Sequence, residues 1–217
     1  MHSEIPHPFL SKETLLEAFS ALNQQLAKED VIGEICIFGG TVMVLAFNAR
    51  LSTKDVDAIF KPPEVFRRNA ALLAESMQLP KDWLNDGVKG FVSDKAEHTE
   101  EGLPKMSNLR MLRPRADYLL AMKCMAARSA AYDTKGDRDD IVFLIQHLGL
   151  NTADEVCKIV EKFYPPERIL PKTQFMIQEV IASLPTPPAE PKEQITHLSA
   201  DDHSTSGQPQ KPDGYEL

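Results

Sequence analysis

The sequence has few cysteines, and they are badly placed for cross-linking. The three, Cys36, Cys124 and Cys157, lie far apart in apolar surroundings. An odd number of widely spaced cysteines fits neither a disulfide framework nor a structural zinc site. We therefore expect reduced thiols in the core of a cytoplasmic protein.

Features of membrane and exported proteins are also missing. No apolar run approaches the roughly 20 residues of a membrane-spanning helix, and residues 1–6 lack the basic start of a secretory signal. We therefore predict no membrane contact. Basic residues are outnumbered by acidic ones, 24 against 32, and the net charge of −8 disfavours nucleic-acid binding over the whole surface. The 42% of hydrophobic residues is nevertheless enough for a core.

Residues 185–217 differ in composition from the rest of the chain. Six of these 33 residues are proline, six are acidic, and Tyr215 is the only aromatic one. Such a segment buries too little apolar surface to offset chain entropy, so we predict a disordered acidic tail. The remainder is predicted to divide into an α/β core at 1–112 and a helical subdomain at 113–184.

Hydrophobic periodicity predicts helices and strands in the first half of the chain and helices alone in the second. Short β-branched runs predict strands at 34–38 and 55–60, and weaker patterns predict strands at 88–93 and 109–112. The predicted fold class is α/β (α+β), a small mixed sheet followed by helices. Apolar spacing and capping signals predict helices near 11–27, 41–47, 63–77, 114–126, 137–148, 152–163 and 171–184.

The strand at 55–60 contains two carboxylates that indicate metal chemistry. Asp55 and Asp57 are two residues apart, and side chains alternate along a strand, so both point to the same face. Val56, Ala58 and Phe60 then point to the other face and can be buried. Two adjacent like charges repel, and a divalent cation relieves that repulsion, so both carboxylates are candidate Mg²⁺ ligands. Such an ion neutralises charge on a phosphoryl or nucleotidyl group during transfer.

A glycine pair precedes these carboxylates by one helix. Gly39, Gly40 and Thr41 follow the strand at 34–38, and glycines here let a phosphate approach the backbone where a helix begins. The short basic loop before the acidic strand adds Lys54 as a candidate nucleotide-binding residue. Each part is common alone. The combination of strand, Gly-Gly-Thr, helix, basic loop and Asp-X-Asp is much more specific.

This order of elements resembles the signature of the nucleotidyltransferase superfamily, in which Gly-Gly or Gly-Ser is followed after one helix by Asp-X-Asp. The form Gly-Gly-Thr at 39–41 with Arg-Leu-Ser-Thr-Lys-Asp-Val-Asp at 50–57 is similar to the AbiEii-like toxins of bacterial abortive-infection systems. It is also similar to a related group of small bacterial nucleotidyltransferase-like proteins. The likeness continues at 117–128 and 137–141, where in the family a helix supplies a lysine and the next helix opens with an acid.

The resemblance covers roughly residues 30–150 and implies a sheet of the nucleotidyltransferase type. It implies Mg²⁺-dependent transfer of a nucleotidyl group from a nucleoside triphosphate to RNA, for example a tRNA, or to a protein hydroxyl. A toxin role implies a cognate antitoxin as partner. The implied site has Gly39, Gly40 and Thr41 at the nucleotide, Asp55 and Asp57 at the metal, and Lys123 and Asp137 as further catalytic groups.

Several alternatives stay open at the level of sequence. Many family members have a third carboxylate on a later strand, whereas the acids at 94–101 lie in a polar stretch that is typical of a loop. Lys123 either binds a phosphate or lays its stem over apolar surface. Asp137 and Asp140 occupy a first helical turn, where acids favour the helix dipole without any catalysis. Basic residues at 105–128 fit an RNA surface and a solvated face equally well. The alternative function is a non-catalytic protein that retains the fold and binds a nucleotide or a partner.

Overall fold

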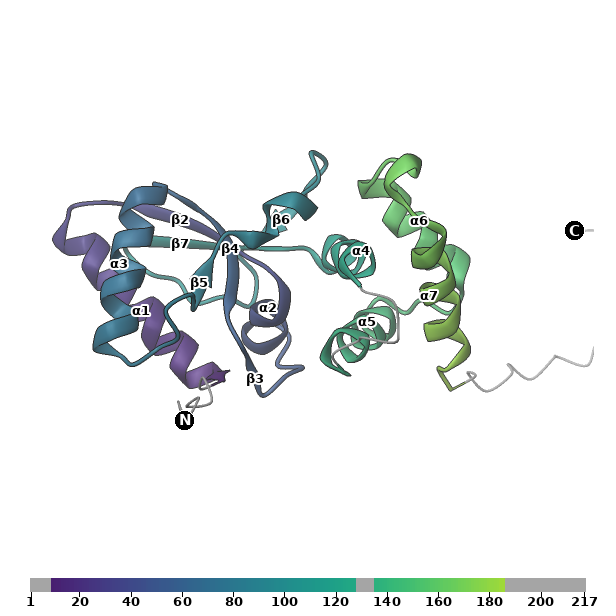
Figure 1. The fold of residues 1–217 in the computed structure, drawn as a ribbon, viewed down its shortest axis with the longest axis horizontal. Coiled ribbons are helices and arrows are strands. Elements are labelled where there is room, and N and C mark those ends of the chain that lie inside the picture. The colour runs from purple at the N-terminus through teal and green to yellow at the C-terminus, as the bar shows by residue number, and fades with distance from the viewer. Residues whose placement is uncertain (1–8, 128–134, 186–217) are drawn as a thin grey trace, which may run out of the picture. The chain divides into compact units, whose positions relative to one another are not determined.

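The computed structural model describes residues 9–127 and 135–185, and the predicted tail lies outside them except for Pro185. The described residues up to Leu184 belong to one compact unit, so the division near residue 112 stays a prediction. The fold is mixed α/β, as predicted (Figure 1). In chain order the elements are β1 (Leu10–Ser11), α1 (Lys12–Lys28), β2 (Gly33–Ile37), α2 (Gly39–Leu45), β3 (Ser52–Thr53), β4 (Val56–Lys61), α3 (Pro63–Ser76), β5 (Leu84–Asn85), the 3-10 helix η1 (Gly87–Phe91), β6 (His98–Thr99), β7 (Leu109–Pro114), α4 (Ala116–Ala126), α5 (Lys135–His147), α6 (Ala153–Phe163), the 3-10 helix η3 (Pro166–Arg168) and α7 (Pro171–Ala182).

The five-stranded sheet has the order β5-β4-β2-β7-β6, with β2 at its centre. Strand β2 runs antiparallel to β4 and parallel to β7. Its last residue, Ile37, lies opposite Ala58 of β4. The next amide, of Phe38, donates to the carbonyl of Asp57 at 2.8 Å. This register places the Gly-Gly turn directly beside the acidic end of β4.

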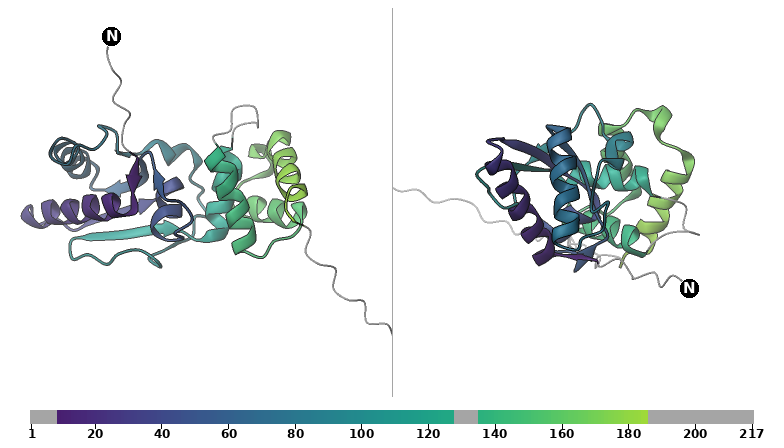
Figure 2. Two further views of the ribbon diagram at one scale, coloured as in Figure 1. Left: turned by 90° about the horizontal axis from the view of Figure 1, so that it is seen from below. Right: turned by 60° about the vertical axis from the view of Figure 1, so that its left-hand side comes forward.

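Helices α1 and α3 contact each other and lie on one face of the sheet (Figure 2). On this side Val56, Ala58 and Phe60 of β4 are buried, as predicted, and Phe60 stacks on Phe66 of α3 with ring centroids 5.1 Å apart. Because side chains alternate along β4, Asp57 lies on the opposite face, away from α1 and α3.

The predicted strand at 88–93 is wrong, because residues 87–91 form the 3-10 helix η1. Glycines at 87 and 90 weaken a strand, since they contribute no side chain to a sheet face. The amide of Gly87 donates to Oδ1 of Asn85 at 2.9 Å, which turns the chain instead. The edge position beside β4 belongs to β5. The strand predicted at 109–112 is confirmed as β7 and continues to Pro114.

Helices follow β7, and α4 contacts α5, α6 and α7. Helix α6 begins with the predicted capping box, in which Thr152 and Glu155 each accept the other's backbone amide. Gly149 ends the preceding segment with a left-handed φ of 67°. These signals are local in sequence, which is why they predict the helix boundaries well.

Two tyrosines fix the chain around η1 to the helices. The amide of Ser93 donates to the hydroxyl of Tyr118 on α4 at 2.8 Å, and the hydroxyl of Tyr164, just after α6, donates to the carbonyl of Phe91 at 2.5 Å. Both rings are almost completely buried. The position of η1 is therefore set by contacts with helices that come later in the chain.

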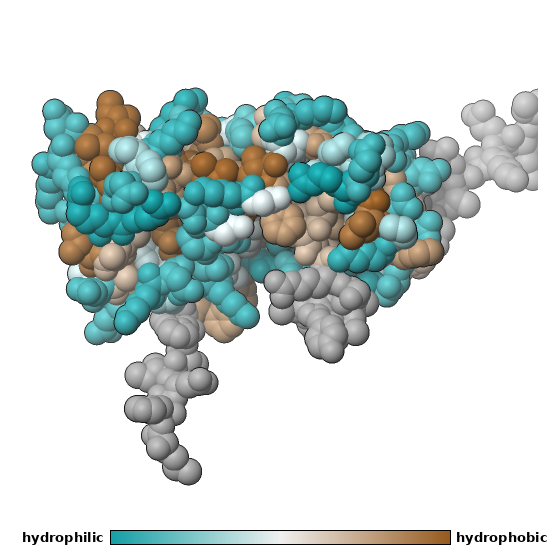
Figure 3. All heavy atoms as spheres, turned by 45° about the horizontal axis from the view of Figure 1, so that its top comes forward, coloured by the Kyte–Doolittle hydropathy of each residue, from teal (hydrophilic) through white to brown (hydrophobic). Residues whose placement is uncertain are grey.

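The three cysteines are free thiols, as predicted: Cys36 and Cys124 are buried and Cys157 is half-buried. Burial raises the pKa of Cys36 and of Cys124 to about 12, so both stay protonated at neutral pH. Across the residues that the structure describes, no helix is both long and apolar enough to cross a membrane. On the face drawn in Figure 3, hydrophobic residues are interspersed with hydrophilic ones.

Candidate functional site

A cleft of about 670 Å³ opens where β4, η1, α4 and the segments before β3 and within α5 meet. It brings together most of the site residues predicted from sequence, although they are separated by up to about a hundred positions in the chain. The predicted residues that line it are Gly39, Gly40, Lys54, Asp55, Asp57, Lys123 and Asp137.

Thr41 is the predicted site residue that the structure does not bring into the cleft. Its side chain is fully buried, and its hydroxyl donates to the backbone carbonyl of Asp55 at 3.0 Å. Thr53 donates to the same carbonyl at 3.3 Å. Thr41 therefore fixes the backbone at the start of the acidic strand rather than facing a ligand.

The surroundings of the two Asp-X-Asp carboxylates disfavour their charged forms. Burial raises the pKa of Asp55, and the charges of Asp57 and Asp82 raise it further. Burial also raises the pKa of Asp57, against the opposing effects of Asn85 and Lys123. A cation placed between these carboxylates would offset the cost of burying their charges and would reduce the repulsion between them.

Gly39 makes room for this carboxylate pair. Its φ is 59°, a conformation that favours glycine. A Cβ at this position would also lie only 3.1 Å from Oδ2 of Asp57. The glycine is thus required by backbone conformation and by the close approach of the carboxylate.

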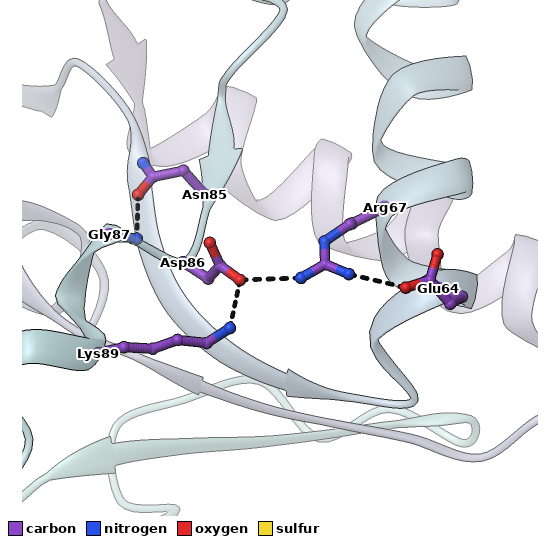
Figure 4. A network of polar contacts seen from close by, with 6 residues as sticks. All are labelled: Glu64, Arg67, Asn85, Asp86, Gly87 and Lys89. Atoms are coloured by element: carbon purple, nitrogen blue, oxygen red, sulfur yellow. Dashed lines mark hydrogen bonds and ion pairs between the residues drawn. The ribbon is translucent and has the colours of Figure 1, made fainter.

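Asn85 is a site residue that sequence reasoning missed. Its Nδ2 donates to Oδ2 of Asp55 at 3.2 Å, while its Oδ1 accepts from the amide of Gly87. Next to it, Asp86 accepts from Arg67 at 3.0 Å and from Lys89 at 2.5 Å, and Figure 4 shows these contacts bracing the turn into η1. The available signal was the turn sequence Asn-Asp-Gly at 85–87.

Lys123 is buried, and its ammonium is held by acids of α5 rather than reaching solvent along its stem. Nζ lies 3.0 Å from Oδ1 of Asp137 and 2.6 Å from Oδ2 of Asp140. The contact with Asp140 is an ion pair whose angles do not meet those of a hydrogen bond. On its other side, the charge of Lys123 lowers the pKa of Asp57. Lys123 therefore pairs with α5 and lines the same cleft as Asp55 and Asp57.

Asp140 differs from the expectation of an acid that merely favours the helix dipole. Its side chain is only 1% exposed, and Oδ1 accepts from Nε of Arg50 at 2.6 Å. A buried carboxylate is tolerated when it is paired and hydrogen-bonded, and here Arg50 and Lys123 share it. Arg50 also lines the cleft. Its partner is 90 residues away in sequence, so no local pattern identifies the pair.

The acids at 94–101 do not supply a third carboxylate to the cleft. Glu97 pairs with Arg115 at 3.6 Å and with Lys162 at 2.9 Å, and Glu100 pairs with Arg110 at 2.7 Å. These contacts also neutralise part of the basic stretch at 105–128, which fits an RNA surface and a solvated face equally well by its sequence. Within residues 9–127 and 135–185, no cluster of three or more His, Cys, Asp or Glu side chains is arranged to hold a metal ion.

The donor set of the cleft nevertheless suits Mg²⁺. This ion takes oxygen ligands, and at sites of phosphate chemistry it typically uses one or two protein carboxylates together with substrate phosphates and water. Asp55 and Asp57 offer two carboxylates on one side of the sheet, and burial is the main cause of their raised pKa values. The residues present therefore fit the ion that the motif predicts.

The fold and the cleft define an α/β protein whose mixed sheet presents a carboxylate pair opposite a buried lysine. The chain matches no family model, no curated protein and no solved structure. The likeness to the nucleotidyltransferase superfamily therefore rests on the sequence motif and stays a prediction.

Proposed function

We propose that the protein is a Mg²⁺-dependent nucleotidyltransferase that moves a nucleotidyl group from a nucleoside triphosphate to RNA, for example a tRNA, or to a protein hydroxyl. The observation that supports this most directly is the cleft that Asp55, Asp57 and Lys123 line together. Paired carboxylates suit a metal ion, and a neighbouring ammonium suits the phosphate that the ion binds.

The size and the remaining lining of the cleft also support a nucleotide. A volume of about 670 Å³ falls in the range of roughly 300–1,000 Å³ found for small-molecule sites. Val88 and Phe91 of η1 and Leu119 and Met122 of α4 give it an apolar lining that suits a base and a sugar. Exposed Lys54 adds a positive charge near the carboxylates.

Four charged residues of the cleft have roles in the proposed reaction. Asp55 and Asp57 hold Mg²⁺, which when bound neutralises charge on the transferring group. Lys123 binds a phosphate oxygen. Asp137, at the cleft and 3.0 Å from Lys123, takes the proton of the acceptor hydroxyl as its oxygen attacks the α-phosphorus. The bond from that phosphorus to the bridging oxygen breaks, and pyrophosphate leaves.

A labelling experiment tests this function. The protein is incubated with Mg²⁺, each of the four α-labelled triphosphates, and either total RNA or total protein as acceptor. Wild type should attach label to one acceptor class, Asp57→Asn should attach none, and the exposed Asp94→Asn should match wild type. Folded wild-type protein that labels neither acceptor with any triphosphate would refute the proposal.

A non-catalytic nucleotide-binding protein is the second candidate. It is favoured by two observations: Glu97, Glu100 and Glu101 form ion pairs with basic residues, and Lys123 is already paired with two carboxylates. Chromatography of the triphosphate after incubation separates the two functions. An enzyme releases pyrophosphate, whereas a binding protein returns the triphosphate intact.

The proposed toxin role has its own test. Induced expression of the wild-type protein in bacteria should arrest growth, because nucleotidyl transfer to an RNA such as tRNA would block its use. Asp57→Asn at the same expression level should not arrest growth. Equal growth of the two strains would remove the toxin role and, with it, the expected cognate antitoxin.

A further inference from the structure

We infer that Arg50 binds the polyphosphate of the substrate through its terminal guanidinium nitrogens and that Asp140 is the positioning residue that orients it. This inference rests on the proposed function, because it assigns a further residue to the same cleft. Arg50 lies between α2 and β3, lines the cleft, and keeps 24% of its side chain exposed. It is therefore partly open to a ligand.

The hydrogen bonding of Arg50 leaves its two terminal nitrogens available. A guanidinium has five N–H donors, and the single donor on Nε is used by Oδ1 of Asp140 at 2.6 Å. Among the described residues, the only side-chain hydrogen bond of Arg50 is the one from Nε, and neither Nη1 nor Nη2 donates one. Fixing Nε also fixes the plane of the group, so the remaining donors form an oriented fork, which is the geometry that binds phosphate oxygens in pairs.

Two glycines leave room for this fork. A Cβ at Gly40 would lie 3.3 Å from Nη1 of Arg50, and a Cβ at Gly136 would overlap Nη2. Both glycines line the cleft, one from the start of α2 and one from the first turn of α5. The guanidinium therefore occupies a slot that exists only because these positions lack a side chain.

The charges around Arg50 point to directed hydrogen bonding rather than to a diffuse positive patch. Arg50 and Lys123 are balanced by Asp137 and Asp140, so this group of four carries no net charge. A buried pair of this kind contributes little to stability compared with an apolar substitute. The pairing with Asp137 and Asp140 does fix the orientation of Arg50 and Lys123, the two cations of this group, which both line the cleft.

The test measures binding without requiring transfer. Calorimetric titration with inorganic tripolyphosphate in the presence of Mg²⁺, and with each nucleoside triphosphate, is done on wild type, Arg50→Gln and Arg50→Lys. We expect Arg50→Gln to weaken tripolyphosphate binding roughly 10- to 100-fold, as for loss of charge-assisted hydrogen bonds. Arg50→Lys should be intermediate, because it keeps the charge and loses the fork. The control Arg68→Gln, an exposed residue of α3 that pairs with Glu29, should bind within about twofold of wild type, like other surface changes.

A second variant moves Arg50 without changing its charge. Gly136→Ala places a methyl group where Nη2 lies and at the same time favours the helix α5. We expect a melting temperature at least equal to that of wild type and tripolyphosphate binding weakened roughly tenfold, about one lost hydrogen bond to a charged group. Gly90→Ala is the control, because a Cβ there meets nothing within 4 Å.

The outcomes separate this inference from the proposed function. Wild-type affinity in both folded Arg50→Gln and folded Gly136→Ala overturns the inference, even if label transfer occurs. If Arg50→Gln does not fold, Gly136→Ala and Arg50→Lys decide in the same way. If tripolyphosphate binding depends on Arg50 while no acceptor is ever labelled, the inference stands and the proposed transfer activity falls. If wild type does not bind tripolyphosphate, the inference is overturned.

Discussion

At the scale of single residues, Asp55 and Asp57 make the cleft electrostatically unfavourable when it is empty of cations. Burial raises the pKa of both above the ordinary value of 3.8, so the folded state binds protons more tightly than the unfolded state. The unfolding free energy therefore falls as pH rises from the unfolded pKa through the raised folded pKa, and it stays lower at neutral pH. These two residues therefore lower the unfolding free energy at neutral pH.

Asp57→Asn should raise the melting temperature at neutral pH in the absence of Mg²⁺, because it removes one of two repelling, half-buried charges. Well below pH 3.8, Asp57 is protonated in both the folded and the unfolded wild type and is uncharged like asparagine, so the difference should disappear. Added Mg²⁺ should stabilise wild type and not the variant. Thermal melts from pH 3 to 8, with and without Mg²⁺, check this. A variant that is less stable than wild type at pH 7, or equally stabilised by Mg²⁺, would contradict the metal assignment.

Lys123→Met tests the buried cation. The substitution leaves the carboxylate of Asp140 buried with Arg50 as its remaining partner.

We therefore predict that Lys123→Met lowers the unfolding free energy by about 3 kcal/mol, as for a broken buried ion pair. It should also reduce nucleotidyl transfer roughly ten- to a thousandfold. Denaturant titration and the labelling rate on one preparation measure both. Lys123→Arg should recover stability more than transfer activity. The control Lys162→Met breaks exposed pairs with Glu97 and Asp117 and should change stability and transfer activity little. Full transfer activity in a folded Lys123→Met protein would exclude the catalytic role.

At the scale of elements, helix α2 and the segment leading into β4 are packed closely together. A Cβ at Gly40 would lie 2.5 Å from Oγ1 of Thr53 and 3.1 Å from its Cβ. Thr53 in turn holds the backbone carbonyl of Asp55. A change at Gly40 is therefore transmitted to the acidic strand through Thr53.

Gly40→Ala should lower the melting temperature and weaken Mg²⁺-dependent triphosphate binding, because the Thr53 backbone must shift to admit the methyl group. We expect a loss of about 1–3 kcal/mol, the usual cost of overpacking. Gly90→Ala is the matched control and should stay within about 1 kcal/mol of wild type. Thermal melts and calorimetry measure both effects. Unchanged stability and binding in Gly40→Ala would mean that this close approach has no energetic role.

The elements that sequence predicted well are those whose signal is local. Alternation over 55–60 predicted both the buried face of β4 and the shared face of Asp55 and Asp57, and the capping box predicted the start of α6. Strands β1 and β3 escaped prediction, because each has two residues and exists only through pairing of Leu10 with Thr53 and Ser11 with Ser52.

The difference between local and long-range signals also explains which site residues the sequence predicted. The motif predicted that Gly39, Gly40, Lys54, Asp55, Asp57, Lys123 and Asp137 would share one site, and all seven line the cleft. Thr41 matched the motif but turns into the core, since its hydroxyl satisfies the carbonyl of Asp55. Asn85, Arg50 and Asp140 were missed because their importance comes from partners 30 and 90 residues away.

At the scale of the whole molecule, we predict that residues 188–217 add nothing to the stability of the folded unit. Their composition offers too little apolar surface to join a core. Deleting them should leave the melting temperature within roughly 2 °C of that of the full chain, less than the shift from a loss of ~1 kcal/mol in a domain of this size. Differential scanning calorimetry of the two proteins measures this. A drop of more than roughly 5 °C would show that the segment packs against the rest.

The pairing of Arg50 with Asp140 also sets an order in time. The two residues are 90 positions apart, and translation proceeds at about 5–20 residues per second, so the arginine is made roughly 5 to 18 seconds before its carboxylate. During that interval the remaining strands, from β3 to β7, are synthesised, while the guanidinium of Arg50 has no Asp140 to orient it. A nascent chain halted before α5 thus holds the acidic strand and the arginine but not Asp140, the carboxylate that orients the arginine in the folded protein.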